Sequence, residues 1–295
     1  MGEYIFIALV AFICETVDSS LGMGYGTILT PVLILLGYNP IQIIPLILAS
    51  EFLTGITAAG LHHKVGNVNL TKGSKAYKVA VILSLCSIVG TIIAVFLTVS
   101  ISPVFVTSYI SILLFLIGIS NIVLIKKEIK MSWFRVSLLG IIASFNKGIS
   151  GGGYGPVVTG GQILSGLKVK NTVGITALSE SFTCLVGLIS YIYLGTLDIN
   201  LPLGIAFISG ALLSVPISVN IIKFINENTL RYILSFIILA LSILNFIKIF
   251  NLISFVYFWP ICVGAFIVVS LVFYLKKNKK SYFNNNLRNL EEMSK

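Results

Sequence analysis

Long apolar segments follow one another along most of this chain, separated by short polar connections. A helix needs about 20 apolar residues to cross about 30 Å of hydrocarbon. Segments that reach this length lie at 40–61, 79–98, 104–125, 172–194, 201–222 and 254–275, and a shorter one lies at 231–247. Charged residues make up 10% of the chain, against about 25% in a soluble domain. The sequence therefore predicts an all-α integral membrane protein that crosses the lipid bilayer several times.

Two further apolar blocks, 3–37 and 134–167, are too long for one helix, and each contains a glycine cluster near its middle. The clusters read "GMGYG" at 22–26 and "GGGYG" at 151–155. Glycine is about 1 kcal/mol less favourable than alanine inside a helix. Each cluster therefore predicts a break between two helical segments, and each block is expected to form a helical hairpin.

The two glycine clusters belong to an internal repeat. When the sequence is aligned with itself so that Gly22 falls on Gly151, the residues Gly24, Tyr25 and Gly26 fall on Gly153, Tyr154 and Gly155. The same alignment, without a gap, pairs Thr30 with Thr159, Ser50-Glu51 with Ser179-Glu180, and Thr54 with Thr183. Self-similarity at a fixed spacing indicates duplication. The predicted organisation is a first repeat (1–125), a cytoplasmic connection (126–135), a second repeat (136–250), an extra transmembrane helix (251–277) and a cytoplasmic tail (278–295).

Charge predicts the orientation, because cytoplasmic connections are enriched in Lys and Arg. The segments 62–78, 126–135 and 276–280 each carry four basic residues, whereas 98–103 carries none. This pattern places the N-terminus outside and the C-terminus in the cytoplasm of a cell-membrane protein, with Lys248 on the unexpected side. The net charge of +10 follows from this topology, so nucleic acid is not an expected partner.

The second hairpin block begins and ends on the cytoplasmic side in this topology. Each repeat is then a glycine-broken hairpin plus three transmembrane helices, and the second repeat is inverted relative to the first. Inverted repeats with broken helices near mid-membrane are typical of secondary transporters.

The glycine breaks are candidate anion sites, because successive backbone N–H groups and a helix N-terminus favour negative charge. The alternative is that these glycines only allow close helix packing. The predicted substrate-binding residues are Gly22, Gly24, Tyr25, Gly26, Thr27, Ser50, Asn146, Lys147, Gly151, Gly152, Gly153, Tyr154, Gly155 and Ser179.

Charged residues inside the membrane are costly and are expected to face the interior of the bundle. Glu51 and Glu180 lie at equivalent positions of the repeat, and they are either proton carriers or caps of the broken-helix N–H groups; Asp18 is a third candidate for proton coupling. Lys147 aligns with Asp18 and either attracts an anionic substrate or pairs with a carboxylate. His62 and His63 are expected at the solvated cytoplasmic edge.

The duplicated stretches "GMGYGTILTPVLILLG" and "SGGGYGPVVTGGQILSG", with "HHKVGNV" after the following span, resemble the TauE/SafE sulfite exporter family, also called the 4-toluene sulfonate uptake permease family. The resemblance covers about residues 1–250. It implies a permease for sulfur-containing oxyanions such as sulfite, sulfonates or thiosulfate, coupled to protons. The alternatives are an uncoupled anion channel of the same fold and a membrane scaffold or assembly protein.

The sequence contains no zinc-protease pair, phosphate-binding loop, nucleophile elbow or dinucleotide fingerprint. No enzymatic activity, catalytic residue, metal site or cofactor is therefore expected.

Overall fold

The computed structural model describes residues 2–123, 132–165, 167–195, 200–221 and 227–249. The predicted extra transmembrane helix (251–277), the tail (278–295) and most of the predicted connection (126–135) lie outside the described residues. The described part is entirely helical: α1 (Gly2–Leu21), α2 (Tyr25–Leu35), α3 (Pro40–Lys64), α4 (Lys75–Ser100), α5 (Pro103–Val123), α6 (Trp133–Ser150), α7 (Tyr154–Leu164), α8 (Val169–Tyr193), α9 (Leu201–Ile221) and α10 (Glu227–Ile249).

The prediction of an all-helical membrane protein is confirmed. Among the described residues, five helices are long and apolar enough to cross a membrane: α1, α3, α4, α8 from Lys170 onward, and α9. The lipid-facing character of these helices is visible in their large exposed apolar side chains, such as Leu85 and Val89 on α4 and Leu213 on α9.

Both long apolar blocks are broken at their glycine clusters, as predicted. Gly22 and Gly24 have φ angles of 69° and 147°, and Gly151 and Gly153 have φ angles of 69° and 78°. Side chains with a Cβ rarely adopt such positive values, so glycine is the residue that permits this turn. The first block therefore forms α1 and α2, and the second forms α6 and α7.

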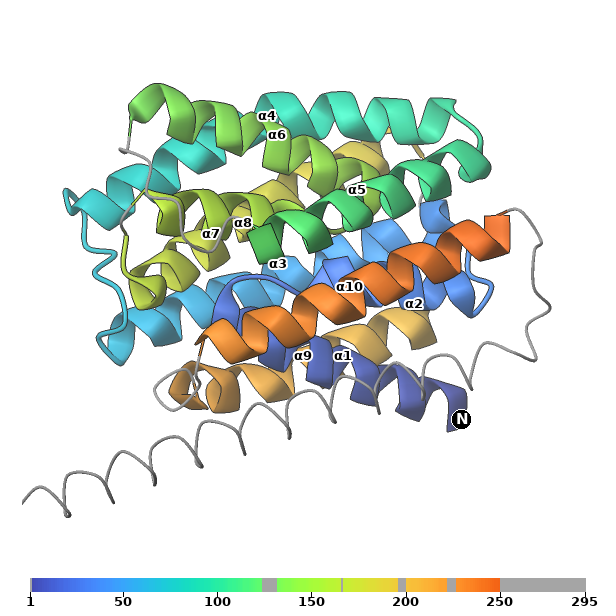
Figure 1. Cartoon of the computed structure of the whole chain (residues 1–295), viewed down its shortest axis with the longest axis horizontal. Coiled ribbons are helices and arrows are strands. Elements are labelled where there is room, and N and C mark those ends of the chain that lie inside the picture. The colour runs from blue at the N-terminus through green and yellow to red at the C-terminus, as the bar shows by residue number, and fades with distance from the viewer. Residues whose placement is uncertain (1, 124–131, 166, 196–199, 222–226, 250–295) are drawn as a thin grey trace, which may run out of the picture. The chain divides into compact units, whose positions relative to one another are not determined.

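The internal repeat is visible in the helix boundaries. The spacing that aligns Gly22 with Gly151 also relates the bounds of α2 to those of α7 at both ends, and the bounds of α3 to those of α8. Packing follows the same correspondence, because α1 lies against α9 while its equivalent α6 lies against α4. Figure 1 shows α4 and α6 at one edge of the bundle and α1 and α9 at the other.

The central pair of helices, α3 and α8, packs in an antiparallel manner. Near the start of α3, Leu48 lies against Gly187 near the end of α8. Further along α3, Gly55 lies against Ala177 and Ser181, which are earlier in α8. Because α3 and α8 are equivalent in the repeat, equivalent helices of the two halves run in opposite directions here.

The two glycine breaks touch each other at the centre of the bundle. A Cβ atom added to Gly152 would lie 2.6 Å from the carbonyl carbon of Gly26 and 2.6 Å from the backbone nitrogen of Thr27. A Cβ atom added to Gly155 would lie 2.8 Å from the Cα atom of Met23. These glycines therefore allow the two breaks to pack closely together, which is the alternative role that the sequence left open.

Lys248, the exception to the charge rule, has a structural role. Its Nζ donates to the backbone carbonyls of Ile34 and Leu35 at the C-terminal end of α2. Lysine side chains stabilise helix C-termini by bonding the last carbonyls, which have no partner within the helix. The positive charge at this end of α10 is thus explained by a helix cap.

We expect Gly152→Ala to destabilise the folded protein, because the added methyl group would meet the backbone of the first break. Overpacking costs about 1–3 kcal/mol, and unyielding backbone raises that cost. The unfolding temperature in detergent should fall by several degrees. Gly160→Ala on α7 is the matched control, since its Cβ would enter open space and alanine favours the helix. Equal unfolding temperatures for the two variants would contradict the proposed contact.

Candidate functional site

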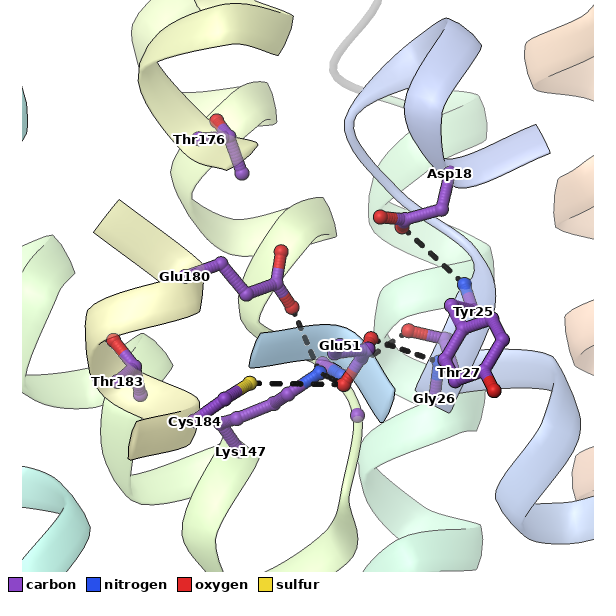
Figure 2. A network of polar contacts seen from close by, with 12 residues as sticks. Asp18, Tyr25, Gly26, Thr27, Glu51, Lys147, Thr176, Glu180, Thr183 and Cys184 are labelled. Atoms are coloured by element: carbon purple, nitrogen blue, oxygen red, sulfur yellow. Dashed lines mark hydrogen bonds and ion pairs between the residues drawn. The ribbon is translucent and has the colours of Figure 1, made fainter. Parts of the chain in front are cut away.

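Carboxylate oxygens accept hydrogen bonds from the backbone N–H groups that the first break leaves without helical partners (Figure 2). The Asp18 Oδ1 atom accepts from the Tyr25 backbone nitrogen at 3.2 Å, and the Glu51 Oε1 atom accepts from the Gly26 nitrogen at 3.3 Å. These are the first two residues of α2, whose N–H groups have no partner within the helix. Glu51 therefore caps the break, which is one of the two roles that the sequence left open.

The second break is held by hydroxyl groups. The Gly153 nitrogen donates to Thr27 Oγ1 at 3.1 Å, and the Gly152 nitrogen donates to Ser150 Oγ at 3.1 Å. Thr159 on α7 donates its hydroxyl to the Gly22 carbonyl at 2.7 Å. The bonds made by Thr27 and Thr159 cross from one half of the chain to the other, so the two breaks are joined by hydrogen bonds as well as by contact.

A buried cation joins the two equivalent glutamates. Lys147 Nζ lies 2.8 Å from Glu180 Oε1 and also forms an ion pair with Glu51 Oε2, and all three side chains are buried. Cys184 Sγ contacts the same Glu51 oxygen at 3.8 Å. Of the roles predicted for Lys147, the structure therefore contains the pairing with carboxylates, and its partners are the glutamates rather than Asp18.

A small cavity lies beside this cluster, between α1, α3 and α8. Its lining consists of Glu15, Asp18, Ser19, Gly22, Glu51, Thr54, Gly55, Ala58, Ala177 and Glu180. Four of these residues are carboxylates, and Lys147 is paired with two of them. The cavity is consequently acidic, although the sequence predicts an anion site here.

Glu15 is a site residue that the predicted set omits. Its carboxylate accepts hydrogen bonds from Ser19 at 2.5 Å and from Thr54 at 3.2 Å. The sequence signal was present, because an acidic residue inside an apolar helix is expected to face the protein interior. Its helical spacing places it on the same face as Asp18, and the fold places that face on the cavity wall.

The remaining predicted residues lie around the same centre. The Tyr25 hydroxyl is 2.9 Å from Ser50 Oγ, and Asn146 Oδ1 accepts from the Tyr109 hydroxyl at 2.5 Å. Tyr154 is fully buried. Ser179 is also buried, and its hydroxyl donates to the Ile175 carbonyl of its own helix at 3.0 Å. These residues support the walls around the breaks.

The expectation that His62 is solvated was wrong. Its side chain is fully buried, and its Nε2 atom lies 2.8 Å from the Ser19 carbonyl oxygen at the end of α1. Proximity to the basic connection suggested a water-exposed edge, but the end of α1, Asn67 and Gly174 of α8 all lie against this side chain. His63, by contrast, is exposed.

The described residues contain no group of three His, Cys, Asp or Glu side chains arranged to hold a metal ion. The chemistry of the site is thus that of carboxylates, hydroxyls, backbone amides and one lysine, and these groups are suited to binding ions and protons.

The comparison with known families agrees with this geometry. The model of the sulfite exporter TauE/SafE family matches residues 7–245. The chain belongs to the TauE/SafE family. The resemblance indicated by the glycine motifs is therefore confirmed, and the family describes membrane transport rather than catalysis.

A curated relative supports the same assignment. The probable membrane transporter protein YtnM of Bacillus subtilis (strain 168) is 28% identical over 233 residues, which cover 74% of this chain and 74% of the relative. No solved structure matches the chain.

Lys147→Met should strongly destabilise the protein, because it leaves two buried carboxylates without their cation. Breaking a buried ion pair by removing one partner costs about 3–5 kcal/mol. The folded yield and the unfolding temperature should both fall, and adding Glu51→Gln with Glu180→Gln should recover most of the loss. Lys170→Met, at an exposed position, is the control. A triple variant no more stable than Lys147→Met would show that the cluster does not depend on charge balance.

Proposed function

We propose that this chain is a secondary transporter that moves small sulfur-containing oxyanions, such as sulfite, sulfonates or thiosulfate, across the cell membrane together with protons. Membership in the TauE/SafE family supports transport of such anions. The observation that carries the proposal is the placement of Asp18 and Glu51 on the N–H groups of the first break.

In this mechanism, the carboxylates of Asp18 and Glu51 accept the hydrogen bonds that substrate oxygens accept once the substrate is bound. Sulfonate and sulfite oxygens accept hydrogen bonds from N–H groups as carboxylate oxygens do, so substrate and carboxylate compete for the same donors. Four carboxylates around one small cavity also repel an incoming anion. Protonation removes both obstacles, because a neutral carboxyl group repels less and accepts more weakly.

The transport cycle follows from this competition. Protons bind to Asp18 and Glu51, the carboxyl groups leave the amides of Tyr25 and Gly26, and the substrate oxygens take their place. Lys147 remains nearby as the positive charge that favours the bound anion. Release of the anion on the other side allows the carboxylates to return to the amides and release their protons. Anion and protons therefore move together.

We propose that the two halves are inverted repeats that provide alternating access. The antiparallel packing of α3 and α8 supports this arrangement. The cavity lies on one side of the breaks, and the residues at its repeat counterpart on the other side are packed against one another. At that counterpart, Leu48 lies against Gly187, and Ser144, Thr183 and Cys184 are fully buried. Exchange of the two arrangements would expose the site to each face in turn.

Purified protein in proteoliposomes should take up sulfite, thiosulfate or sulfoacetate when a pH gradient is imposed, and should discriminate against chloride. Asp18→Asn should reduce this uptake at least tenfold, a loss of about 1.4 kcal/mol, because the side chain no longer exchanges a proton. Exchange of labelled for unlabelled substrate without a gradient should persist, since the amides of the break are retained. Glu3→Gln, at an exposed acidic position, is the control.

Two outcomes of this flux measurement would overturn the proposal. Flux of none of the sulfur anions would remove the substrate assignment and favour a scaffold. Flux that is independent of the pH gradient in the wild-type protein would identify an uncoupled channel.

Alternating access predicts that Cys184 becomes reactive only during transport. It is fully buried at the repeat counterpart of the cavity. In a variant with Cys14, Cys86 and Cys262 replaced by Ser, maleimide labelling of Cys184 should be slow at rest. Substrate flux should accelerate this labelling. The reagent should reach Cys184 from one membrane face, and it should reach Ala58→Cys, in a variant without the native cysteines, from the opposite face. Persistent flux with unreactive Cys184 would contradict this mechanism.

A further inference from the structure

His62 makes two hydrogen bonds that define its protonation state. Its Nε2 atom faces the Ser19 carbonyl oxygen at 2.8 Å, so Nε2 carries the proton. Its Nδ1 atom lies 2.9 Å from Asn67 Nδ2, an amide nitrogen that only donates. The imidazole in this arrangement is therefore neutral, with its single proton directed at the end of α1.

Asn67 cannot readily turn to receive a proton from His62. Its Nδ2 atom also donates to the Val219 carbonyl of α9 at 3.2 Å. Rotation of the amide would place its oxygen against that carbonyl oxygen, and the bond to α9 would be lost. Protonation of Nδ1 therefore opposes two donors within a buried region and leaves a positive charge without a partner, which is unfavourable.

The repeat contains an equivalent of this contact with a different side chain. The Tyr191 hydroxyl donates to the Gly148 carbonyl at 3.0 Å. The repeat alignment pairs Tyr191 with His62 and Gly148 with Ser19. Each half of the chain thus holds the last turn of its hairpin's first helix with a side chain from the following long helix. Histidine titrates near neutral pH and tyrosine does not.

The His62 contact lies at the edge of the cavity. Ser19, which provides the carbonyl, and Ala58, one turn before His62 on α3, both line the cavity. Breaking the contact would release α1 from α3 at this wall. The contact therefore joins α1 to α3 at this wall of the cavity.

We propose that His62 is a proton-operated latch that closes this end of the cavity, and that Tyr191 is its non-titrating equivalent at the other break. The proposal rests on the proposed transport function and adds a second, separate proton-sensitive group to it. Protonation of His62 opens the latch, while the Tyr191 contact is unaffected over the same pH range. Acid then opens the contact made by His62 at the first break and leaves the contact made by Tyr191 at the second break closed.

The titratable groups on the elements packed against His62 do not bond to it in the described structure. The acidic and basic ones are Glu3, Glu15 and Asp18 on α1, Glu51, His63 and Lys64 on α3, and Lys170 and Glu180 on α8; the described residues of α9 include none. Glu15 and Asp18 on α1 line the same cavity as Ser19, so their carboxylates are the acidic groups on the cavity wall beside this contact.

Cysteine labelling in membranes tests the latch without requiring transport. Ala58→Cys, introduced after replacing the native cysteines by Ser, reports on the cavity, and Gly60→Cys at an exposed position of the same helix corrects for the pH dependence of thiol chemistry. The corrected labelling rate should rise at least threefold between about pH 7.5 and about pH 5.5, which bracket the ordinary imidazole pKa of about 6.5. His62→Gln should abolish the rise, because glutamine still donates to Ser19 but does not titrate.

Matched variants separate the latch from general effects of acid. His63→Gln should keep the rise. Tyr191→His should create a rise in the labelling of Cys184 as the sole cysteine, because it places a titratable group at the equivalent contact. The latch is refuted if the wild-type background shows no rise or if His62→Gln retains it. Sulfur-anion flux is measured on the same preparations: flux without a pH-dependent rise refutes only the latch, and a rise without flux refutes only the proposed transport function.

Discussion

A helix that breaks within an apolar interior releases backbone N–H groups, and every other feature of this site follows from how those groups are satisfied. An unpaired amide in hydrocarbon costs several kcal/mol. The chain supplies Asp18 and Glu51 as acceptors, which brings buried carboxylates to the centre of the bundle. Glu51, together with its repeat equivalent Glu180, in turn requires a cation, and Lys147 provides it. The break, the acids and the lysine thus form one interdependent arrangement.

Contact between the two breaks makes them move as a unit. The backbone of Gly152 lies against that of Gly26 with no space for a side chain, and Thr27 and Thr159 bond across the same interface. A shift of one break therefore displaces the other. Close-packed interfaces of this kind tend to switch between discrete arrangements instead of deforming gradually, which is the behaviour that alternating access requires.

The sequence was sufficient to predict the features that depend on local pattern. Glycine spacing located both breaks, apolar length located the helices, and the internal repeat identified α3 and α8 as equivalents. The pairing of Lys147 with glutamate was among the stated alternatives. These predictions succeeded because each depends on residues close together in the chain or on simple repetition.

Features that depend on tertiary packing were not predictable. Capping of a break was one of the two roles predicted for Glu51, but its spacing from Gly26 does not indicate which amide the carboxylate reaches. His62 was expected in water because charge near the end of a span usually marks the membrane surface, but contacts that include the Ser19 carbonyl and Asn67 bury it. Lys248 was unexplained for a similar reason, since its partners, the last carbonyls of α2, lie in the opposite half of the sequence.

The difference between Asp18 and Lys147 gives the two breaks different chemistry. These residues occupy equivalent positions of the repeat but carry opposite charges. At the first break, an acid accepts from a backbone amide; at the second, hydroxyls hold the amides and the lysine faces the glutamates. Two identical acidic breaks would lack a cation at the centre, and two basic ones would lack the carboxylate that accepts from the Tyr25 amide. Divergence at this single pair of positions therefore places a cation and an amide-capping carboxylate within one site, and the proposed co-transport of an anion with protons depends on that combination.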